Sequence, residues 1–127
     1  GLVNLRHFAE IQKLRIIQCE TYFELLHGVR MLTLPPKIEG WNGAYFPILF
    51  KDEKTLLQVV SKLNDFKIYP RRYFYPSLTS LDIWDGHCPN ACDTASRVLC
   101  LPLYHDLSRD SQFKIASIIK DKLNGTI

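Results

Sequence analysis

The segment 67–78, KIYPRRYFYPSL, constrains the fold more than any other part of this chain. Two prolines, Pro70 and Pro76, bracket two arginines and three consecutive aromatic residues. Proline has no amide proton and also restricts the residue before it, so this segment cannot form an ordinary helix. Aromatic residues favour strands, and we therefore expect a strand over 68–74 that leads into a binding surface. The alternative is an ordinary sheet strand, with its rings in the core and its arginines in water.

Hydrophobic periodicity divides the rest of the chain into alternating helices and strands. Asp52 and Ser108 stand where helix N-caps are expected, and Pro89 suits the first turn of a short helix. The expected order is a helix over 2–27, an extended connector over 29–43, a strand over 44–50, a helix over 53–66, the strand over 68–74, a short helix over 89–96, a strand over 98–101 and a helix over 109–124.

Such an order of elements is typical of an α+β fold. We expect a small, mostly antiparallel sheet of about three strands, with helices packed on one face and a long helix at the N-terminus. No repeat, low-complexity stretch or linker divides the chain. Residues 1–127 are therefore expected to form a single domain.

Composition excludes several classes of protein. Hydrophobic residues make up 46% of the chain, which is enough for a core and too many for a disordered protein. A formal charge of +3 is well short of the basic surface of a dedicated DNA-binding protein. No apolar run approaches the roughly 20 residues that span a bilayer, so we expect no membrane partner. The four cysteines are expected to be free thiols in a reducing compartment, which predicts a cytoplasmic location.

Few residues have the spacing of a catalytic or metal site. His87, Cys88 and Cys92 form a metal-like cluster, but a single Cys-x3-Cys pair lacks the second pair that zinc sites usually have. A nucleophilic pair of Cys88 with His105 is less expected than two structural side chains. The nine lysines fall on polar faces, helix ends and turns, which are not the desolvated setting of a covalent lysine. We therefore expect no metal ligand and no catalytic residue in this chain.

Several segments match a known family in the correct order. The chain opens with GLVNL at 1–5, carries IYPRRYFYP at 68–76 and continues with Cys88-Pro89. The block ASRVLCLPLY at 95–104 resembles a family signature, Ser-x-Arg-Val-Leu-x-Leu-Pro-Leu-Tyr, and Leu107-Ser108 continues the match. On these residues, nearly the whole chain resembles the C-terminal part of the DegT/DnrJ/EryC1/StrS sugar aminotransferases. These are pyridoxal-phosphate enzymes of the aspartate-aminotransferase fold class.

The resemblance implies that this chain is only part of an enzyme. Such enzymes hold the Schiff-base lysine and pyridoxal 5'-phosphate in a large N-terminal domain, which we expect to have been removed upstream of Gly1. The small C-terminal domain closes over the cofactor and helps to hold a nucleotide-linked sugar. The parent would transfer an amino group, from glutamate, to a keto sugar on a nucleoside diphosphate, and it would be a homodimer. The fragment alone is expected to be inactive and to bind no cofactor.

The resemblance also implies which residues bind the substrate. Arg71, Tyr73 and Tyr75 would face the nucleotide sugar. Arg71 would pair with a phosphate or carboxylate, and the tyrosines would contact sugar hydroxyls or stack. The match weakens after this segment, because Thr79 and Ser80 stand where many family members have a histidine.

A binding module is the alternative function. The basic and aromatic run Arg71–Tyr75 could form a platform on which the bases of single-stranded nucleic acid stack, or a surface for a protein. The small net charge argues against nucleic acid as a partner. A reading frame that begins at a Met near Gly1 would favour a free-standing interaction domain.

Overall fold

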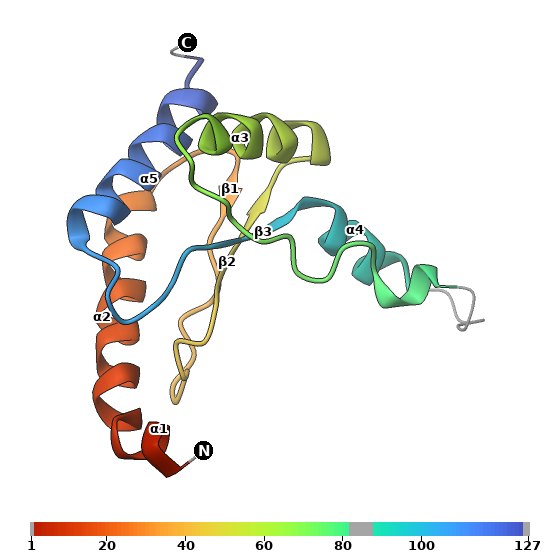
Figure 1. Cartoon of the computed structure of the whole chain (residues 1–127). Coiled ribbons are helices and arrows are strands. Elements are labelled where there is room, and N and C mark those ends of the chain that lie inside the picture. Colours follow the sequence, from red (N-terminus) through yellow and green to blue (C-terminus); the bar gives the residue numbers. More distant parts are fainter. Residues whose placement is uncertain (1, 82–87, 126–127) are drawn as a thin grey trace.

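The computed structural model of the chain describes residues 2–81 and 88–125, and in these ranges helices pack against a small sheet (Figure 1). None of the described helices has the length and apolarity needed to cross a membrane. The elements in chain order are α1 (Leu2–Arg6), α2 (Phe8–Leu26), β1 (Leu32–Thr33), β2 (Phe46–Phe50), α3 (Glu53–Asp65), a short 3-10 helix (Leu78–Ser80), α4 (Pro89–Arg97), β3 (Val98–Leu101) and α5 (Arg109–Leu123).

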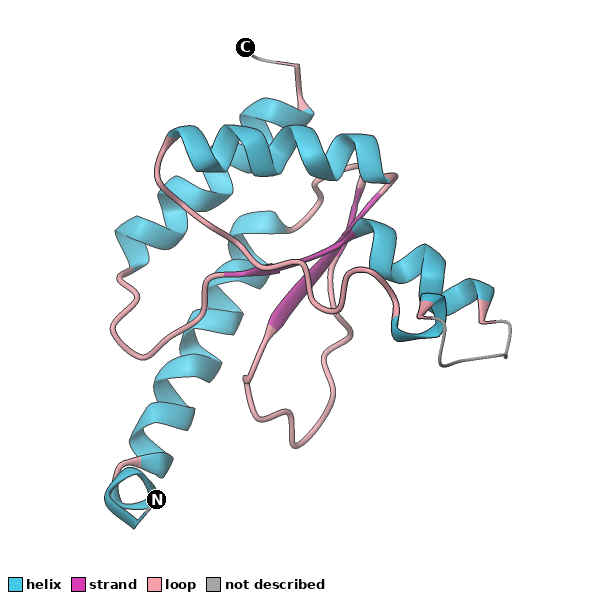
Figure 2. Cartoon of the chain, turned by 45° about the vertical axis from the view of Figure 1, so that its right-hand side comes forward, coloured by secondary structure: helices cyan, strands magenta, loops and turns pink. Residues whose placement is uncertain are grey.

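The strands form one antiparallel sheet in the order β1-β2-β3 (Figure 2). Leu32 of β1 pairs with Phe50 of β2, and Ile48 of β2 pairs with Leu99 of β3. Helices α2, α3 and α5 share one hydrophobic core with the sheet, while α4 extends away from it (Figure 1). This architecture confirms the expected α+β fold, with helices on one face of a small antiparallel sheet.

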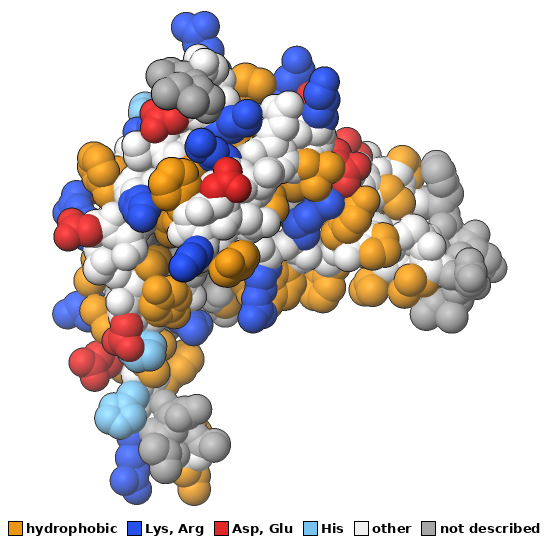
Figure 3. Space-filling view, turned by 45° about the horizontal axis from the view of Figure 1, so that its top comes forward, with side chains coloured by type: hydrophobic (Ala, Val, Ile, Leu, Met, Phe, Trp, Pro, Cys, Tyr) orange, Lys and Arg blue, Asp and Glu red, His pale blue; other side chains and the backbone are white. Residues whose placement is uncertain are grey.

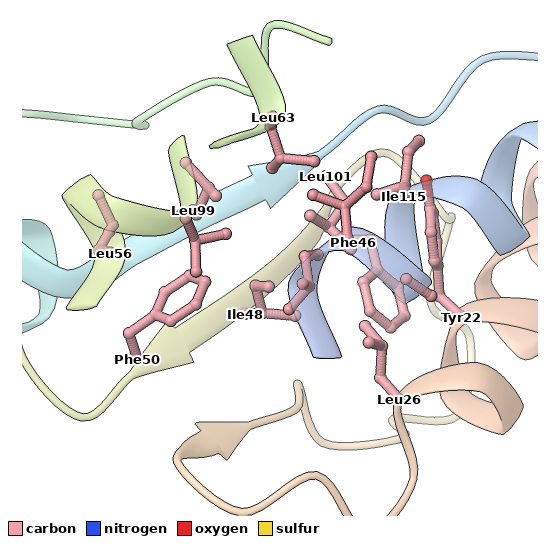
Figure 4. Packing of buried hydrophobic residues seen from close by; sticks show 14 of the residues in the cluster. Tyr22, Leu26, Phe46, Ile48, Phe50, Leu56, Leu63, Leu99, Leu101 and Ile115 are labelled. Atoms are coloured by element: carbon pink, nitrogen blue, oxygen red, sulfur yellow. The ribbon is translucent and has the colours of Figure 1, made fainter. Parts of the chain in front are cut away.

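The inside of the molecule is apolar, whereas its surface is mixed. In the view of Figure 3, charged side chains are spread over the body of the molecule with hydrophobic ones between them. Inside, Phe46, Ile48 and Phe50 alternate along β2 and are fully buried, whereas Pro47 and Leu49 between them are half-buried. The buried side chains of the helices pack on this face of β2, among them Tyr22, Leu26, Leu56, Leu63 and Ile115 (Figure 4). A period of two along the strand and one apolar stripe on each helix therefore account for the core.

The starts of three helices agree with the sequence expectations. The Asp52 carboxylate accepts a hydrogen bond from the Thr55 amide at 2.7 Å, and this bond lowers the pKa of the carboxyl. The Ser108 hydroxyl accepts from the Ser111 amide at 3.2 Å, and Pro89 is the first residue of α4. These residues place the beginnings of α3, α4 and α5 where the sequence predicts them.

The expected strand over 68–74 is wrong. Within it, only Arg71 pairs with the sheet, exchanging two backbone hydrogen bonds of 3.2 and 2.9 Å with Cys100. In this register the next bonded pair would join Tyr69 to Pro102, and Pro102 has no N–H group to donate. Lys67, just before the segment, has a left-handed φ of 59°. The pairing with β3 is a single bridge, and the segment around it is irregular.

Two smaller expectations also differ from the structure. The helix expected over 2–27 is interrupted at His7, whose backbone has φ −102° and ψ 1°. Leu2 and Leu5 of α1 are 80% and 67% exposed, so little packing within the described chain favours a continuous helix. The connector expected over 29–43 contains β1, which is too short to produce a periodic pattern in the sequence.

Two buried glutamines, Gln18 of α2 and Gln112 of α5, connect α5, α2 and the loop that follows β3. The Gln112 side chain donates to the backbone carbonyl of Gln18 at 2.8 Å, which joins the two helices. The side-chain NH2 group of Gln18 in turn lies 2.7, 3.2 and 3.1 Å from the carbonyl oxygens of Tyr104, His105 and Leu107, so its two N–H groups are shared among three acceptors of the loop. One side chain therefore attaches this loop to the helical layer.

We expect Gln18→Leu to lower the free energy of unfolding by about 2 kcal/mol, because the substitution removes the donor from partly buried carbonyl groups. Gln58→Leu, on the exposed side of α3, is the matched control and should change it by less than about 0.5 kcal/mol. Urea unfolding followed by circular dichroism measures both values. Equal effects of the two substitutions would show that Gln18 does not hold the loop.

Candidate functional site

A cleft of about 500 Å³ opens beside β3. Its walls come from α2, the loop before β2, the segment 69–73 and the end of β3 with the loop after it. None of its described lining residues is acidic. We call it the Arg71 cleft, and its charged and phenolic lining residues are Arg15, Tyr45, Tyr69, Arg71, Tyr73 and Tyr104. Two guanidinium groups and four phenols therefore line one space.

The position of Arg71 is set by its backbone. Its amide and carbonyl both bond to Cys100, so the side chain projects from a fixed point at the edge of β3. The Arg71 Nη1 donates to the hydroxyl oxygen of Tyr73 at 3.1 Å. Within the described residues this is the only side-chain hydrogen bond of Arg71. Its other N–H groups can therefore donate to a ligand.

Tyr45 and Tyr73 form a pair within the Arg71 cleft. Their ring centroids lie 4.8 Å apart. The Arg71 guanidinium, whose Nη1 donates to the Tyr73 hydroxyl, lowers the pKa of Tyr73. The neighbouring Tyr73 phenol raises the pKa of Tyr45. Arg71 and the two phenols therefore lie next to one another in the lining of the cleft.

Arg72 and Tyr75 lie outside the Arg71 cleft. Arg72 Nη2 donates to the Glu53 carboxylate and to the carbonyl of Ser96, both at 2.8 Å. Its guanidinium carbon lies 3.5 Å from the centre of the Tyr75 ring. Bonding by Arg72 lowers the pKa of the Glu53 carboxyl. The structure thus brings Arg71 and Tyr73 together but places Tyr75 with Arg72, so substrate contact by Tyr75 stays a prediction.

The sequence expectations missed two residues of the cleft, Arg15 and Tyr45. Arg15 directly follows Leu14, which belongs to the apolar stripe of α2. A charged residue at the edge of such a stripe indicates that this part of the helix faces a polar environment. Tyr45 lies at the start of an apolar run and carries no comparable signal. The tertiary fold alone brings both residues to Arg71.

The remaining candidate residues do not join the cleft. His87 lies outside the described residues, so the expectation about its cluster with Cys88 and Cys92 stays a prediction. Among the residues that are described, no three His, Cys, Asp or Glu side chains gather in one place. His105 Nε2 lies 3.1 Å from the Asp106 carboxylate, and neither His105 nor Cys88 lines the cleft.

The lysines do not fit the attachment of an aldehyde cofactor such as pyridoxal phosphate. Lys62, Lys120 and Lys122 are half-buried, the other six are exposed, and none of the nine lines the Arg71 cleft. A lysine that forms a Schiff base at neutral pH needs a desolvated setting that depresses its pKa. The described residues therefore support no covalent step through this cofactor.

Comparison with known proteins places the chain among aminotransferases. Residues 1–120 match the DegT/DnrJ/EryC1/StrS aminotransferase family. A relative in Escherichia coli, dTDP-4-amino-4,6-dideoxy-D-glucose transaminase, is 33% identical over 135 residues, which cover 97% of this chain and 36% of that protein. The chain therefore spans little more than a third of the length of this relative.

Two solved structures share the fold. The aminotransferase TlmJ from Streptoalloteichus hindustanus superimposes with a TM-score of 0.89 at 23% identity, over 100% of this chain and 35% of that chain. The putative sugar aminotransferase Spr1654 from Streptococcus pneumoniae, in its PLP form, gives 0.86 at 17% identity, over 100% and 35%. The match over residues 1–120, together with the Escherichia coli relative, shows that this chain belongs to the DegT/DnrJ/EryC1/StrS aminotransferase family.

Proposed function

We propose that this chain is the small C-terminal domain of a nucleotide-sugar aminotransferase. The observation that carries the proposal is the match of 97% of the chain to 36% of a dTDP-sugar transaminase. In the parent protein, an amino group from glutamate is transferred to a keto sugar on a nucleoside diphosphate. The parent acts as a homodimer in the cytoplasm, a location supported by the four free cysteines.

The chemistry of the Arg71 cleft supports this role. A nucleotide sugar combines a charged diphosphate with neutral hydroxyl groups. Arginine donors suit the phosphate oxygens, and phenol hydroxyls can both donate to and accept from a sugar. Arg71 and Tyr73 supply one group of each kind, already joined by a hydrogen bond of 3.1 Å. We therefore propose that Arg71 and Tyr73 face the nucleotide-linked sugar.

The first helices support a partner domain. Leu2, Leu5, Phe8 and Ile17 are 80%, 67%, 55% and 52% exposed. Large apolar side chains on one end of the molecule are typical of a surface that another part of the protein covers. We propose that the large N-terminal domain of the parent covers this surface.

The cofactor is assigned to that large domain as well. Pyridoxal phosphate supplies the electron sink that amino-group transfer requires. The lysines of this chain do not fit its attachment, as described above. In the proposal, the residues of this chain therefore bind and orient the sugar substrate and help to exclude water from the reacting groups.

A nucleic-acid platform has less support. Stacking of bases would need several rings and cations of the run Arg71–Tyr75 on one open surface. Arg72 is instead engaged by Glu53 at 2.8 Å and covers the ring of Tyr75. Only part of the run is thus available to a polynucleotide.

The first prediction of the proposed function concerns covalent binding of the cofactor. When this chain is mixed with pyridoxal phosphate and reduced with borohydride, we expect no stoichiometric lysine adduct, because none of its lysines has a desolvated setting. Mass spectrometry of the reduced protein measures the result. A single modified lysine at 1:1 stoichiometry would contradict the proposed division between the two domains.

The second prediction concerns the gene. We expect the DNA upstream of the codon for Gly1 to continue the reading frame into a larger domain that contains a Schiff-base lysine. Sequencing of this region provides the measurement. A start codon close to Gly1, with no larger domain encoded before it, would exclude the proposal and favour a free-standing binding module.

The third prediction concerns substrate binding in the parent enzyme. Arg71→Gln should raise KM for the nucleotide sugar by about tenfold or more, because it removes charge-assisted hydrogen bonds. Tyr73→Phe should raise KM by a smaller factor, since it removes a neutral group. Arg109→Gln, which alters an exposed ion pair with Glu24, is the matched control and should leave KM within about twofold. Unchanged KM in Arg71→Gln would remove Arg71 from the substrate site.

A further inference from the structure

We infer that Arg15 and Arg71 together form a binding site for a compact dianion in the Arg71 cleft. The inference deepens the proposed function and rests on it for the identity of the ligand. The anion is either the diphosphate of the nucleotide, whose two phosphates each carry one negative charge, or the dicarboxylate amino donor. In both cases, planar guanidinium groups donate paired N–H groups to ligand oxygens.

Arg15 has a buried donor without an acceptor. The side chain extends from α2 to the lining of the cleft. Its Nε is buried, and no acceptor among the described residues bonds to it. Arg72 Nε is buried without an acceptor as well, although that guanidinium bonds to Glu53 and Ser96, so the unpaired Nε alone does not mark a ligand site. Because the Nε of Arg15 is closed to the cleft, a ligand there would accept hydrogen bonds from the remaining N–H groups of the guanidinium.

The backbone at Gly43 approaches α2 closely at the base of the Arg15 side chain. Gly43 has a φ of 62°, and a Cβ at this position would lie 3.2 Å from the Cβ of Arg15 and 3.2 Å from the Cδ1 of Ile16. Glycine is the residue that best combines a left-handed conformation with such a close approach. The loop before β2 therefore packs on α2 beside Arg15, which brings the two walls of the cleft together.

The positive charges of the cleft are not balanced by carboxylates. Arg72, Arg97 and Arg109 each pair with a carboxylate, at 2.8, 2.7 and 3.3 Å. In the described part of the chain, no ion pair involves Arg15 or Arg71. Two cations that line one space with no acidic neighbour in its lining attract a ligand with two negative charges.

The test measures the binding of inorganic pyrophosphate and of glutarate to this 127-residue chain, at low ionic strength, by NMR of the arginine Nε–H groups. We expect at least one of the two anions to shift the Nε signals of both Arg15 and Arg71 in a saturable manner. Arg15→Gln and Arg71→Gln should each weaken that binding by about tenfold or more. Arg15→Lys keeps the charge and most of the stem but loses the planar fork, and it should show an intermediate loss.

Arg109→Gln is the matched control, because it removes the same charge from an exposed position away from the cleft. It should change the affinity by less than about twofold. Equal losses in Arg15→Gln and Arg109→Gln would overturn the inference, since they would report general attraction of anions to the surface. Unchanged binding by a folded Arg15→Gln protein, or no binding of either anion to the wild-type chain, would overturn it too.

The two anions separate the two sources of the ligand. Tighter binding of pyrophosphate assigns the site to the diphosphate of the nucleotide, and tighter binding of glutarate assigns it to the amino donor. A nucleoside diphosphate sugar serves as a third probe. If pyrophosphate or glutarate binds through Arg15 but the nucleoside diphosphate sugar binds no more tightly than these anions, the anion site stands and the proposed function is weakened. If the sugar nucleotide binds equally well to Arg15→Gln, the proposed function stands and the anion site is rejected.

Discussion

The side-chain amide of Gln18 joins the first long helix to the loop that follows the last strand, and the Arg71 cleft depends on this connection. β3 is held by its pairing with β2 and by burial along its whole length. Beyond β3 the chain needs other partners. The side-chain NH2 group of Gln18 donates to carbonyl oxygens of the loop, and the Tyr22 hydroxyl donates to the carbonyl of Pro102 at 2.9 Å. Burial raises the pKa of Tyr22, so this hydroxyl keeps the proton that it donates. Two polar side chains of α2 thus hold one wall of the cleft in place.

Two neighbouring arginines have different roles for a structural reason. Backbone bonds of Arg71 to Cys100 fix the chain at the edge of the sheet, and consecutive side chains of an extended backbone point to opposite sides. Arg71 lines the cleft beside Tyr73, whereas Arg72 reaches Glu53 and the end of α4. An arginine with a carboxylate partner stabilises the domain, and an arginine without one can bind a ligand. The pattern Arg-Arg in the sequence does not distinguish these roles.

Much of the fold follows from local patterns in the sequence. β2, β3, α3, α4 and α5 lie close to their predicted ranges, because periodic apolar residues and the caps Asp52 and Ser108 are local signals. The prediction was wrong over 68–74, which is rich in strand-forming residues but pairs with the sheet at Arg71 alone. In that register Tyr69 would lie opposite Pro102, which has no N–H group to donate, and this pairing partner cannot be read from the segment itself.

The site was predictable in part. Arg71 and Tyr73 were expected to act together, and the structure places them within hydrogen-bonding distance in one cleft. Tyr75 was expected beside them but lies against Arg72. Arg15 and Tyr45 were missed because each is remote from Arg71 along the chain, and no local pattern records a contact of that kind.

The sequence by itself determined the types of the main helices and strands, the apolar faces that form the core, and the family to which the chain belongs. These properties depend on residues near one another along the chain, or on the order of short motifs. Only the tertiary structure decided which cations share a space, which arginine has a carboxylate partner, and which tyrosine accepts a hydrogen bond from Arg71. Those properties depend on contacts between α2, the loop before β2 and the segment beside β3, which come together only when the sheet and its helical layer have packed.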